Sequence, residues 1–103
     1  MADYRLSRRA ASDLEAIADY TIEQFGVAQA RRYRDSLRLC FERRSDNPRM
    51  GRRAEQLSPG LRRFEHRSHV VFYTPGDDEV FIVRILHARM NAPSAQMAGG
   101  DWT

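Results

Sequence analysis

The fold of this chain is decided by residues 61–90, which read LRRFEHRSHVVFYTPGDDEVFIVRILHARM. Three runs in this stretch, 61–67, 69–74 and 79–87, are rich in β-branched and aromatic residues and therefore predict three strands. Ser68 is a tight break between the first two strands, and the Pro-Gly-Asp-Asp turn after the second makes the last two a hairpin. Because the connections are short, the three strands are expected to be antiparallel.

The last of these strands is apolar on both faces. Strict alternation directs Phe81, Val83 and Ile85 toward the helices, with His87 in phase with them. The other face then holds three more apolar residues together with Arg84. A strand of this kind is central in a sheet, or else its second face is covered. We expect no other segment of this chain to cover that face, so the sequence predicts a partner protein there.

The residues before 47 predict one strand and two helices. Residues 4–6 alternate and indicate a short strand, and Ser7 is a plausible N-cap for the helix that follows. Gly26 is expected to end this first helix, since glycine tolerates a positive φ. The second helix begins near Val27 and ends before Pro48. A connection of about two residues must fold the helices back antiparallel, and the segment after them is expected to be a polar loop.

The two helices are amphipathic. In the first, an apolar stripe at helical spacing runs from Ala10 to Phe25, whereas Asp13 and the other acidic residues are assigned to a solvated face. In the second, Tyr33 and Cys40 belong to the apolar stripe, and Cys40 is interpreted as a small apolar filler. Neither helix can bury its stripe alone, so both are expected to pack on the sheet.

These elements predict an α+β fold of order β-α-α-β-β-β, in which an antiparallel helical hairpin packs on a small antiparallel sheet and the first strand joins an edge. The chain of 103 residues fits one domain, expected at 1–92, with 93–103 as a C-terminal tail that carries Trp102. One cysteine, no long apolar run and no signal-peptide core are typical of a cytoplasmic protein.

The basic charge is carried by arginine alone, with 17 arginines and no lysine. Arginine forms planar, bidentate contacts with carboxylates and phosphates, although a GC-rich genome would produce the same bias. Residues 48–69 hold six arginines and two glutamates, a patch of net +4. Such a patch suits nucleic acid or an acidic protein partner. The six arginines are Arg49, Arg52, Arg53, Arg62, Arg63 and Arg67.

Five short motifs, in this order along the chain, resemble the ParE-like toxins of the RelE/ParE superfamily. They are 28–30 with Tyr33, the proline–glycine loop 47–52, the sheet entry 57–64, the middle strand 69–73 and the closing segment 84–90. Each motif is short, so the resemblance rests on the order of all five and on the matching order of the elements. It covers residues 4–91.

The resemblance implies the toxin component of a type II toxin–antitoxin system. ParE-like toxins inhibit DNA gyrase by stabilising its cleaved-DNA complex, with no bond chemistry of their own. A ParD-like antitoxin neutralises them in a hetero-oligomer and binds operator DNA, so any DNA contact through that partner is indirect. No cofactor, metal or membrane is expected. The residues expected to bind target or antitoxin are Arg62, Arg63, Arg67, Arg84, Arg89 and Met90.

Two alternatives stay open. The RelE branch of the superfamily cleaves messenger RNA on the ribosome, which needs groups that move protons and hold the phosphorane charge. The missing lysine and Ala88 depart from the RNA-cleaving pattern. His87 is interpreted as a hydrogen-bonded structural histidine rather than a catalytic one, and Arg84 is either paired within the fold or kept for an acidic partner. The second alternative is a silent or regulatory partner of an antitoxin. The residues that would serve RNA cleavage are His87, Arg84 and Arg67, with His66 and His69.

Overall fold

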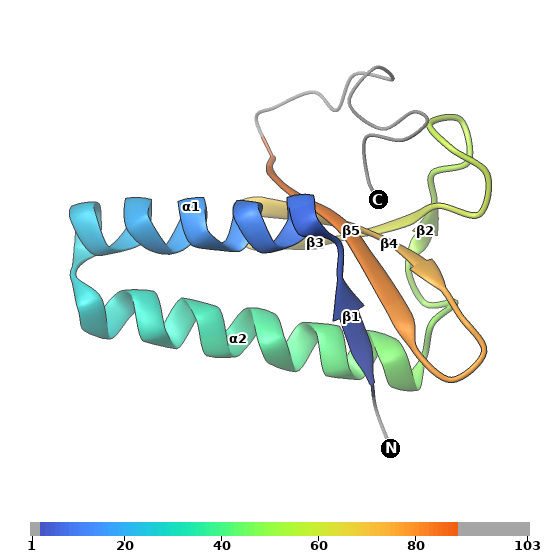
Figure 1. The fold of residues 1–103 in the computed structure, drawn as a ribbon, viewed down its shortest axis with the longest axis horizontal. Coiled ribbons are helices and arrows are strands. Elements are labelled where there is room, and N and C mark those ends of the chain that lie inside the picture. The colour runs from blue at the N-terminus through green and yellow to red at the C-terminus, as the bar shows by residue number, and fades with distance from the viewer. Residues whose placement is uncertain (1–2, 89–103) are drawn as a thin grey trace.

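The computed structural model of this chain describes residues 3–88 and joins five strands in one sheet, in the order β1-β5-β4-β3-β2 (Figure 1). The first strand pairs parallel with β5, and the other neighbours pair antiparallel, so the predicted α+β class and the edge position of the first strand are confirmed. The elements are β1 (Tyr4–Leu6), α1 (Arg8–Phe25), α2 (Val27–Asp46), β2 (Arg52–Arg53), β3 (Arg62–His66), β4 (His69–Pro75) and β5 (Val80–His87).

The predicted polar loop after α2 is wrong at Arg52–Arg53, which pair with the first two residues of β3 as an edge strand. The turn before this strand is held by the Tyr73 hydroxyl, which donates to the carbonyl oxygen of Pro48 at 2.6 Å and accepts from the Gly51 N–H at 3.0 Å. Gly51 is required because a Cβ there would lie 2.9 Å from the carbonyl oxygen of Arg63. These contacts are long-range, so local sequence pattern does not reveal them.

Ser7 and Gly26 bound α1 as expected. The Ser7 hydroxyl accepts from the Ala10 N–H at 2.9 Å, which makes it the N-cap, and donates to the carbonyl oxygen of Val83 at 2.7 Å. The Ser7 N–H also donates to the carbonyl oxygen of Ile82 at 2.9 Å, so the start of α1 is tied to β5. Gly26 has a φ of 92° and reverses the chain into α2. The turn of the hairpin lies at the end away from the sheet (Figure 1).

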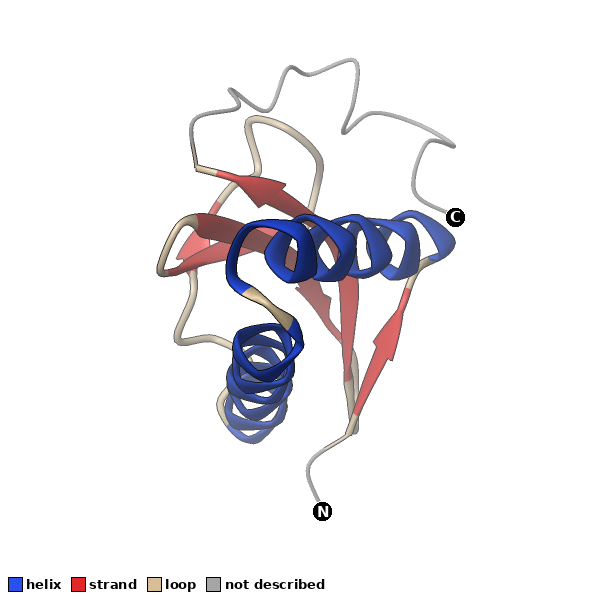
Figure 2. Cartoon of the chain, turned by 90° about the vertical axis from the view of Figure 1, so that its left-hand side faces the viewer, coloured by secondary structure: helices blue, strands red, loops and turns tan. Residues whose placement is uncertain are grey.

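The two helices pack on one face of the sheet (Figures 1 and 2). Most of the core lies between the helices and this face. Tyr73 and Phe41 are the largest fully buried side chains of this cluster. Burial of a large apolar side chain contributes about 1.5–3 kcal/mol, so this cluster is the main stabiliser of the fold. Its buried members are Ala10, Leu37, Phe41, Phe64, Val71, Tyr73, Val80, Ile82 and Ile85.

The chain itself covers the second face of the sheet, so the prediction of a partner protein on that face was wrong. Ala54 and Leu61, both fully buried, come from the connection between β2 and β3, and Leu57 packs against them. They meet four apolar side chains from the far face of β4 and β5. Three apolar residues scattered through a loop show no periodicity, which is why the sequence did not indicate this cover. The sheet residues they meet are Val70, Phe72, Val83 and Leu86.

A β-bulge changes which residues of β5 face the helices. Consecutive residues of β4 pair with Arg84 and Ile82, which leaves Val83 as the extra residue. One extra residue reverses the alternation of faces along a strand. Phe81 and Val83 therefore pack on the second face and Ile82 under the helices, contrary to the prediction. Ile85, which follows the bulge, packs under the helices as predicted.

Candidate functional site

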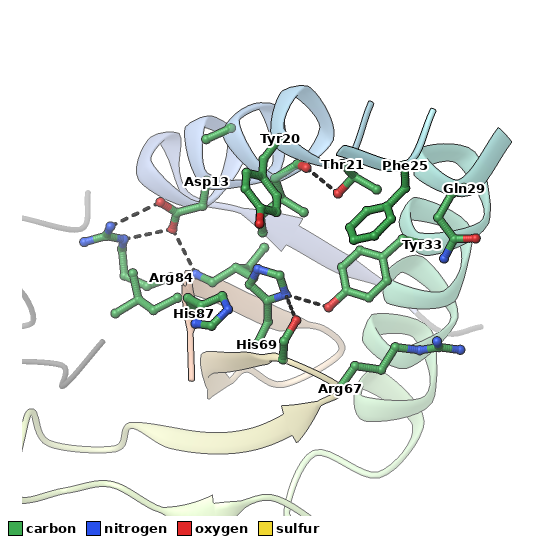
Figure 3. A pocket seen from close by; sticks show the side chains of 15 residues that line it. Asp13, Tyr20, Thr21, Phe25, Gln29, Tyr33, Arg67, His69, Arg84 and His87 are labelled. Carbon is green, nitrogen blue, oxygen red and sulfur yellow. Dashed lines mark hydrogen bonds and ion pairs between the residues drawn. The ribbon is translucent and has the colours of Figure 1, made fainter. Parts of the chain in front are cut away.

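A groove of about 620 Å³ lies between the helical hairpin and the second half of β5 (Figure 3). The first strand pairs with β5 only from Val80 to Ile82, and beyond that point α1 rather than a described strand faces this edge. Tyr20 and Phe25 of α1 line the groove with exposed fractions of 61% and 68%. Exposed apolar side chains beside a strand edge are typical of a surface that a protein partner covers.

A cluster of tyrosine and histidine rings lines the groove (Figure 3). The Tyr33 hydroxyl of α2 lies 2.5 Å from Nδ1 of His69 at the start of β4. The His69 ring meets the His87 ring edge to face, with 5.5 Å between the ring centroids. Arg67 and Ser68, from the turn between β3 and β4, line the same groove. Five groups that can donate, accept or carry a positive charge are thus brought together from α2, β4, β5 and the turn between β3 and β4.

Burial favours the neutral state of two imidazoles, those of His69 and His66. Burial lowers the pKa of His69, and the nearby His87 and His66 lower it further, whereas Asp13 acts in the opposite direction. Burial is also the main cause that lowers the pKa of His66, and Arg67 adds to it. Because an ordinary histidine has a pKa of about 6.5, both rings are uncharged at neutral pH. They can then accept hydrogen bonds from hydroxyl groups.

His66 connects β3 to α2 rather than lining the groove. Its Nε2 lies 2.9 Å from the Ser36 hydroxyl, and its Nδ1 lies 3.1 Å from the Cys40 sulfur. Burial raises the pKa of the Cys40 thiol, so this group stays protonated at neutral pH. Both ring nitrogens of His66 are therefore engaged by α2, which argues for a structural role.

Arg84 is paired within the fold. Its guanidinium makes a bidentate contact with Asp13 of α1, with Nε 2.9 Å from Oδ2 and Nη2 3.1 Å from Oδ1. The same Asp13 oxygen accepts from the Ile85 N–H at 2.9 Å. The side chains of Arg84 and Asp13 are only 10% and 15% exposed. Of the two roles considered for Arg84, the structure therefore shows the paired one, and a role in binding a partner stays a prediction.

The residues predicted to bind target or antitoxin do not form one site. Arg67, which has a φ of 54°, and Arg84 both line the groove. In contrast, Arg62 and Arg63 begin β3, which lies two strands away from β5 in the sheet. The predicted set therefore divides between two surfaces. Two further predicted residues lie outside the described residues: Arg89 and Met90.

Sequence reasoning missed the contribution of α1 to this site. Asp13 was assigned to a solvated face, yet its side chain is 15% exposed and bonded to β5. Phe25 was assigned to the buried stripe, yet it is 68% exposed because the hairpin turn lies beyond the sheet. A signal was present in both cases. Asp13 lies close to the buried stripe, and Phe25 is a large apolar residue directly before the turn glycine Gly26.

Two other kinds of site are not found within residues 3–88. No three side chains of His, Cys, Asp or Glu there are grouped so that they could hold a metal ion. Neither of the two helices in that part of the chain is long and apolar enough to cross a membrane. The groove and the arginine-rich end of the sheet are therefore the surfaces on which a function can be argued.

Comparisons with known proteins agree with the residue motifs and the fold. The family profile described as "ParE toxin of type II toxin-antitoxin system, parDE" matches residues 4–92. Toxin ParE1 of Caulobacter vibrioides is 46% identical over 92 residues, which is 89% of this chain and 95% of that protein. Toxin ParE1 of Mycobacterium tuberculosis is 39% identical over 89 residues, covering 85% and 91%.

A solved structure gives the same result for the fold. A chain of the chromosomal ParDE TA system from P. aeruginosa superposes with a TM-score of 0.71 at 22% identity, over 86% of this chain and 98% of that one. At this identity the likeness shows the fold, whereas the family profile and the two relatives show the family. This chain therefore belongs to the ParE toxin family of type II toxin–antitoxin systems.

Proposed function

We propose that this ParE-family toxin inhibits DNA gyrase by stabilising its cleaved-DNA complex, and that a ParD-like antitoxin neutralises it in the cytoplasm. The observation that carries the proposal is the match of residues 4–92 to the ParE toxin family. Binding without bond chemistry suits a groove whose rim is exposed and apolar, as Tyr20 and Phe25 make it. Such a rim can bury area against another protein.

The groove is the surface we assign to the antitoxin. Residues 54–61 cover the second face of the sheet, whereas Tyr20 and Phe25 form an exposed apolar rim that is open to a partner. The edge of β5 beyond Ile82 lies beside this rim. A segment with apolar side chains toward α1 would bury this rim beside that edge, where Ser7 and Asp13 already bond the Val83 carbonyl and the Ile85 N–H. Arg67 at one end of the groove would favour an acidic residue in that segment.

The antitoxin assignment is tested with Phe25→Ser and a matched control, Met50→Ser. Both residues are about equally exposed, at 68% and 69%, but Met50 does not line the groove. Each variant is co-expressed with the ParD-like antitoxin of the same system, and the affinity of the purified pair is measured. Phe25→Ser should weaken binding at least tenfold, since aromatic anchors carry much of an interface's energy, while Met50→Ser should not. Equal affinities for both variants would remove the groove from the interface.

The gyrase assignment is tested by expression and by reconstitution. Expression of the toxin without its antitoxin should arrest growth, and purified toxin should trap cleaved DNA or alter supercoiling when incubated with gyrase and supercoiled plasmid. Normal growth combined with unchanged supercoiling would instead favour the silent or regulatory partner.

RNA cleavage remains the second candidate, because His69, His87 and Arg67 line one groove. Imidazoles can move protons, and a guanidinium beside them can stabilise a phosphorane. The engagement of Arg84 by Asp13 leaves that guanidinium less able to bind a phosphate, which favours the gyrase proposal. Cleavage of messenger RNA on ribosomes, lost in His87→Ala and accompanied by no effect on gyrase, would reverse this preference.

A further inference from the structure

The edge of the sheet opposite β1 carries two pairs of arginines, one pair on each face of the sheet, because side chains alternate along a strand. Arg52 of β2 pairs directly with Arg63 of β3, and Arg53 pairs directly with Arg62. Side chains at directly paired positions lie about 4.5–5.5 Å apart at their Cβ atoms, and like charges there destabilise a sheet. The two Arg–Arg pairs are therefore expected to reduce the stability of this edge of the sheet when no partner neutralises their charge.

Few acidic groups offset this charge. A single carboxylate oxygen, Oε1 of Glu65, serves both Arg52 at 3.0 Å and Arg63 at 3.3 Å. Glu55 lies 4.0 Å from Arg53, and its side chain is 55% exposed. Ion pairs this exposed contribute little, because water screens them. The charge of the patch is therefore only partly neutralised within the fold.

The guanidiniums of this edge differ in exposure, and the Arg63 side chain, which lies over the Phe72 ring, is 32% exposed. Nη1 of Arg62 donates to the carbonyl oxygens of Gly51 at 2.7 Å and Arg49 at 3.1 Å, which fixes the turn that carries Arg49. The side chains of Arg52 and Arg53 are 72% and 74% exposed. We define the arginine surface by these residues together with the Arg63 side chain: Arg49, Arg52, Arg53, Arg62 and Arg63.

We propose that the arginine surface binds the phosphate backbone of double-stranded DNA. Duplex DNA presents one negative charge about every 1.7 Å along its axis, so it can engage several guanidiniums at once and relieve their repulsion. Arginine is suited to this contact because its planar fork matches phosphate oxygens.

A single strand suits the arginine surface less well than a duplex does. Binding of single strands relies on exposed aromatic rings on which bases stack. The Phe72 ring, whose centroid lies 5.8 Å from the guanidinium carbon of Arg63, is only 2% exposed. An acidic protein segment would also need apolar anchors, and the exposed aromatic side chains Tyr20 and Phe25 lie at the groove instead.

The test measures binding of the full chain to a labelled duplex of about 20 base pairs, by fluorescence anisotropy, without gyrase or antitoxin. Four phosphate contacts predict a log–log salt slope of about −3.6, so affinity should fall about 150-fold between about 50 and 200 mM salt. In Arg52→Gln/Arg53→Gln, which removes two contacts, the slope should shrink to about −1.8. The matched control is Arg31→Gln/Arg34→Gln, which removes the same charge from exposed positions of α2 and should keep the slope of the unchanged chain.

Several results would overturn the proposal. They are an unchanged slope in Arg52→Gln/Arg53→Gln, an equal loss in the α2 control, or equally tight binding of a polyglutamate peptide or a single strand of the same charge. Relief of the Arg–Arg pairs should also leave the urea midpoint of Arg52→Gln/Arg53→Gln unchanged or raise it. A clearly lower midpoint would assign these arginines to the fold. Because gyrase is absent, failure of this proposal and failure of gyrase inhibition are seen separately.

Discussion

Removal of the Asp13 carboxylate should destabilise this toxin more than any other change to a charged residue of α1. Asp13→Ala leaves the guanidinium of Arg84, 10% exposed, without its bidentate partner, and removes the acceptor of the Ile85 N–H. Loss of one partner from a buried ion pair costs about 3–5 kcal/mol, because the remaining charge is left without compensation. A domain of this size has a total stability of about 5–15 kcal/mol, so the loss is a large fraction of it.

Urea denaturation followed by circular dichroism measures this loss. With a urea m-value of about 1.5 kcal/mol/M, a loss of about 4 kcal/mol lowers the midpoint by about 2–3 M. Asp19→Ala is the matched control, since Asp19 lies on the same helix and is exposed, and it should change the stability by less than about 0.5 kcal/mol. Arg84→Met combined with Asp13→Ala removes both charges and keeps most of the side-chain volume of Arg84. The double variant should therefore lose only about 1–3 kcal/mol, mainly through the buried Ile85 N–H.

Two results would refute this reasoning. A loss below about 1 kcal/mol in Asp13→Ala would mean that solvent already compensates Arg84. An equal loss in Asp13→Ala and in the double variant would mean that no energetic coupling joins the two side chains. In either case Arg84 would return to the residues available for a partner.

Three further predictions concern the turn before β2 and the groove. Tyr73→Phe removes a donor to Pro48 and an acceptor for Gly51, so it should cost about 1–3 kcal/mol in urea unfolding, whereas Tyr20→Phe, at an exposed ring, should be neutral. Gly51→Ala should cost about 1–3 kcal/mol by thermal or urea unfolding, because its Cβ meets the ring of Tyr73, and an unchanged midpoint would contradict the close packing. The pKa of His69 is lowered in the fold, so its contribution is present above pH about 6.5 and is lost as pH falls below it. The urea midpoint should fall between pH 7.5 and about 5.5, and His69→Gln should reduce that fall; an equal fall in the variant would exclude His69 as its source.

The sequence predicts those elements whose cause is local. Each helix boundary is set by a residue that affects the backbone next to it. These residues are Ser7 at the start of α1, Gly26 at its end and Pro48 after α2, and all three boundaries are where they were expected. The three long strands were likewise predictable, because their apolar runs and turns are contiguous. Periodicity thus predicted every element except β2, and together with the five motifs it supported the family resemblance that the comparisons confirm.

The features that were not predicted depend on contacts between residues that are far apart in the sequence. The edge strand β2 depends on Tyr73, and the cover of the second face depends on Leu57 and Leu61 meeting β4 and β5. The bulge at Val83 adds one residue to β5 relative to β4, which a single-strand pattern cannot register. Asp13 was misplaced for the same reason, since its partner Arg84 is 71 residues away. The histidines and arginines were found as residue types, but their division between two surfaces required the structure.

The order of the strands separates the two proposed surfaces. The groove borders β5 and the start of β4, whereas the arginine surface lies on β2, the turn before it and the first two residues of β3, at the end of β3 away from the groove. An antitoxin segment confined to the groove would therefore leave Arg52 and Arg53 exposed, and neutralisation would act on the encounter with gyrase rather than on contact with DNA. The toxin should therefore keep its salt-dependent affinity for duplex DNA when it is bound to an antitoxin fragment that contains only the groove-binding segment. If that fragment abolished duplex binding, the two surfaces would be one interface, and the division argued from the sheet order would be wrong.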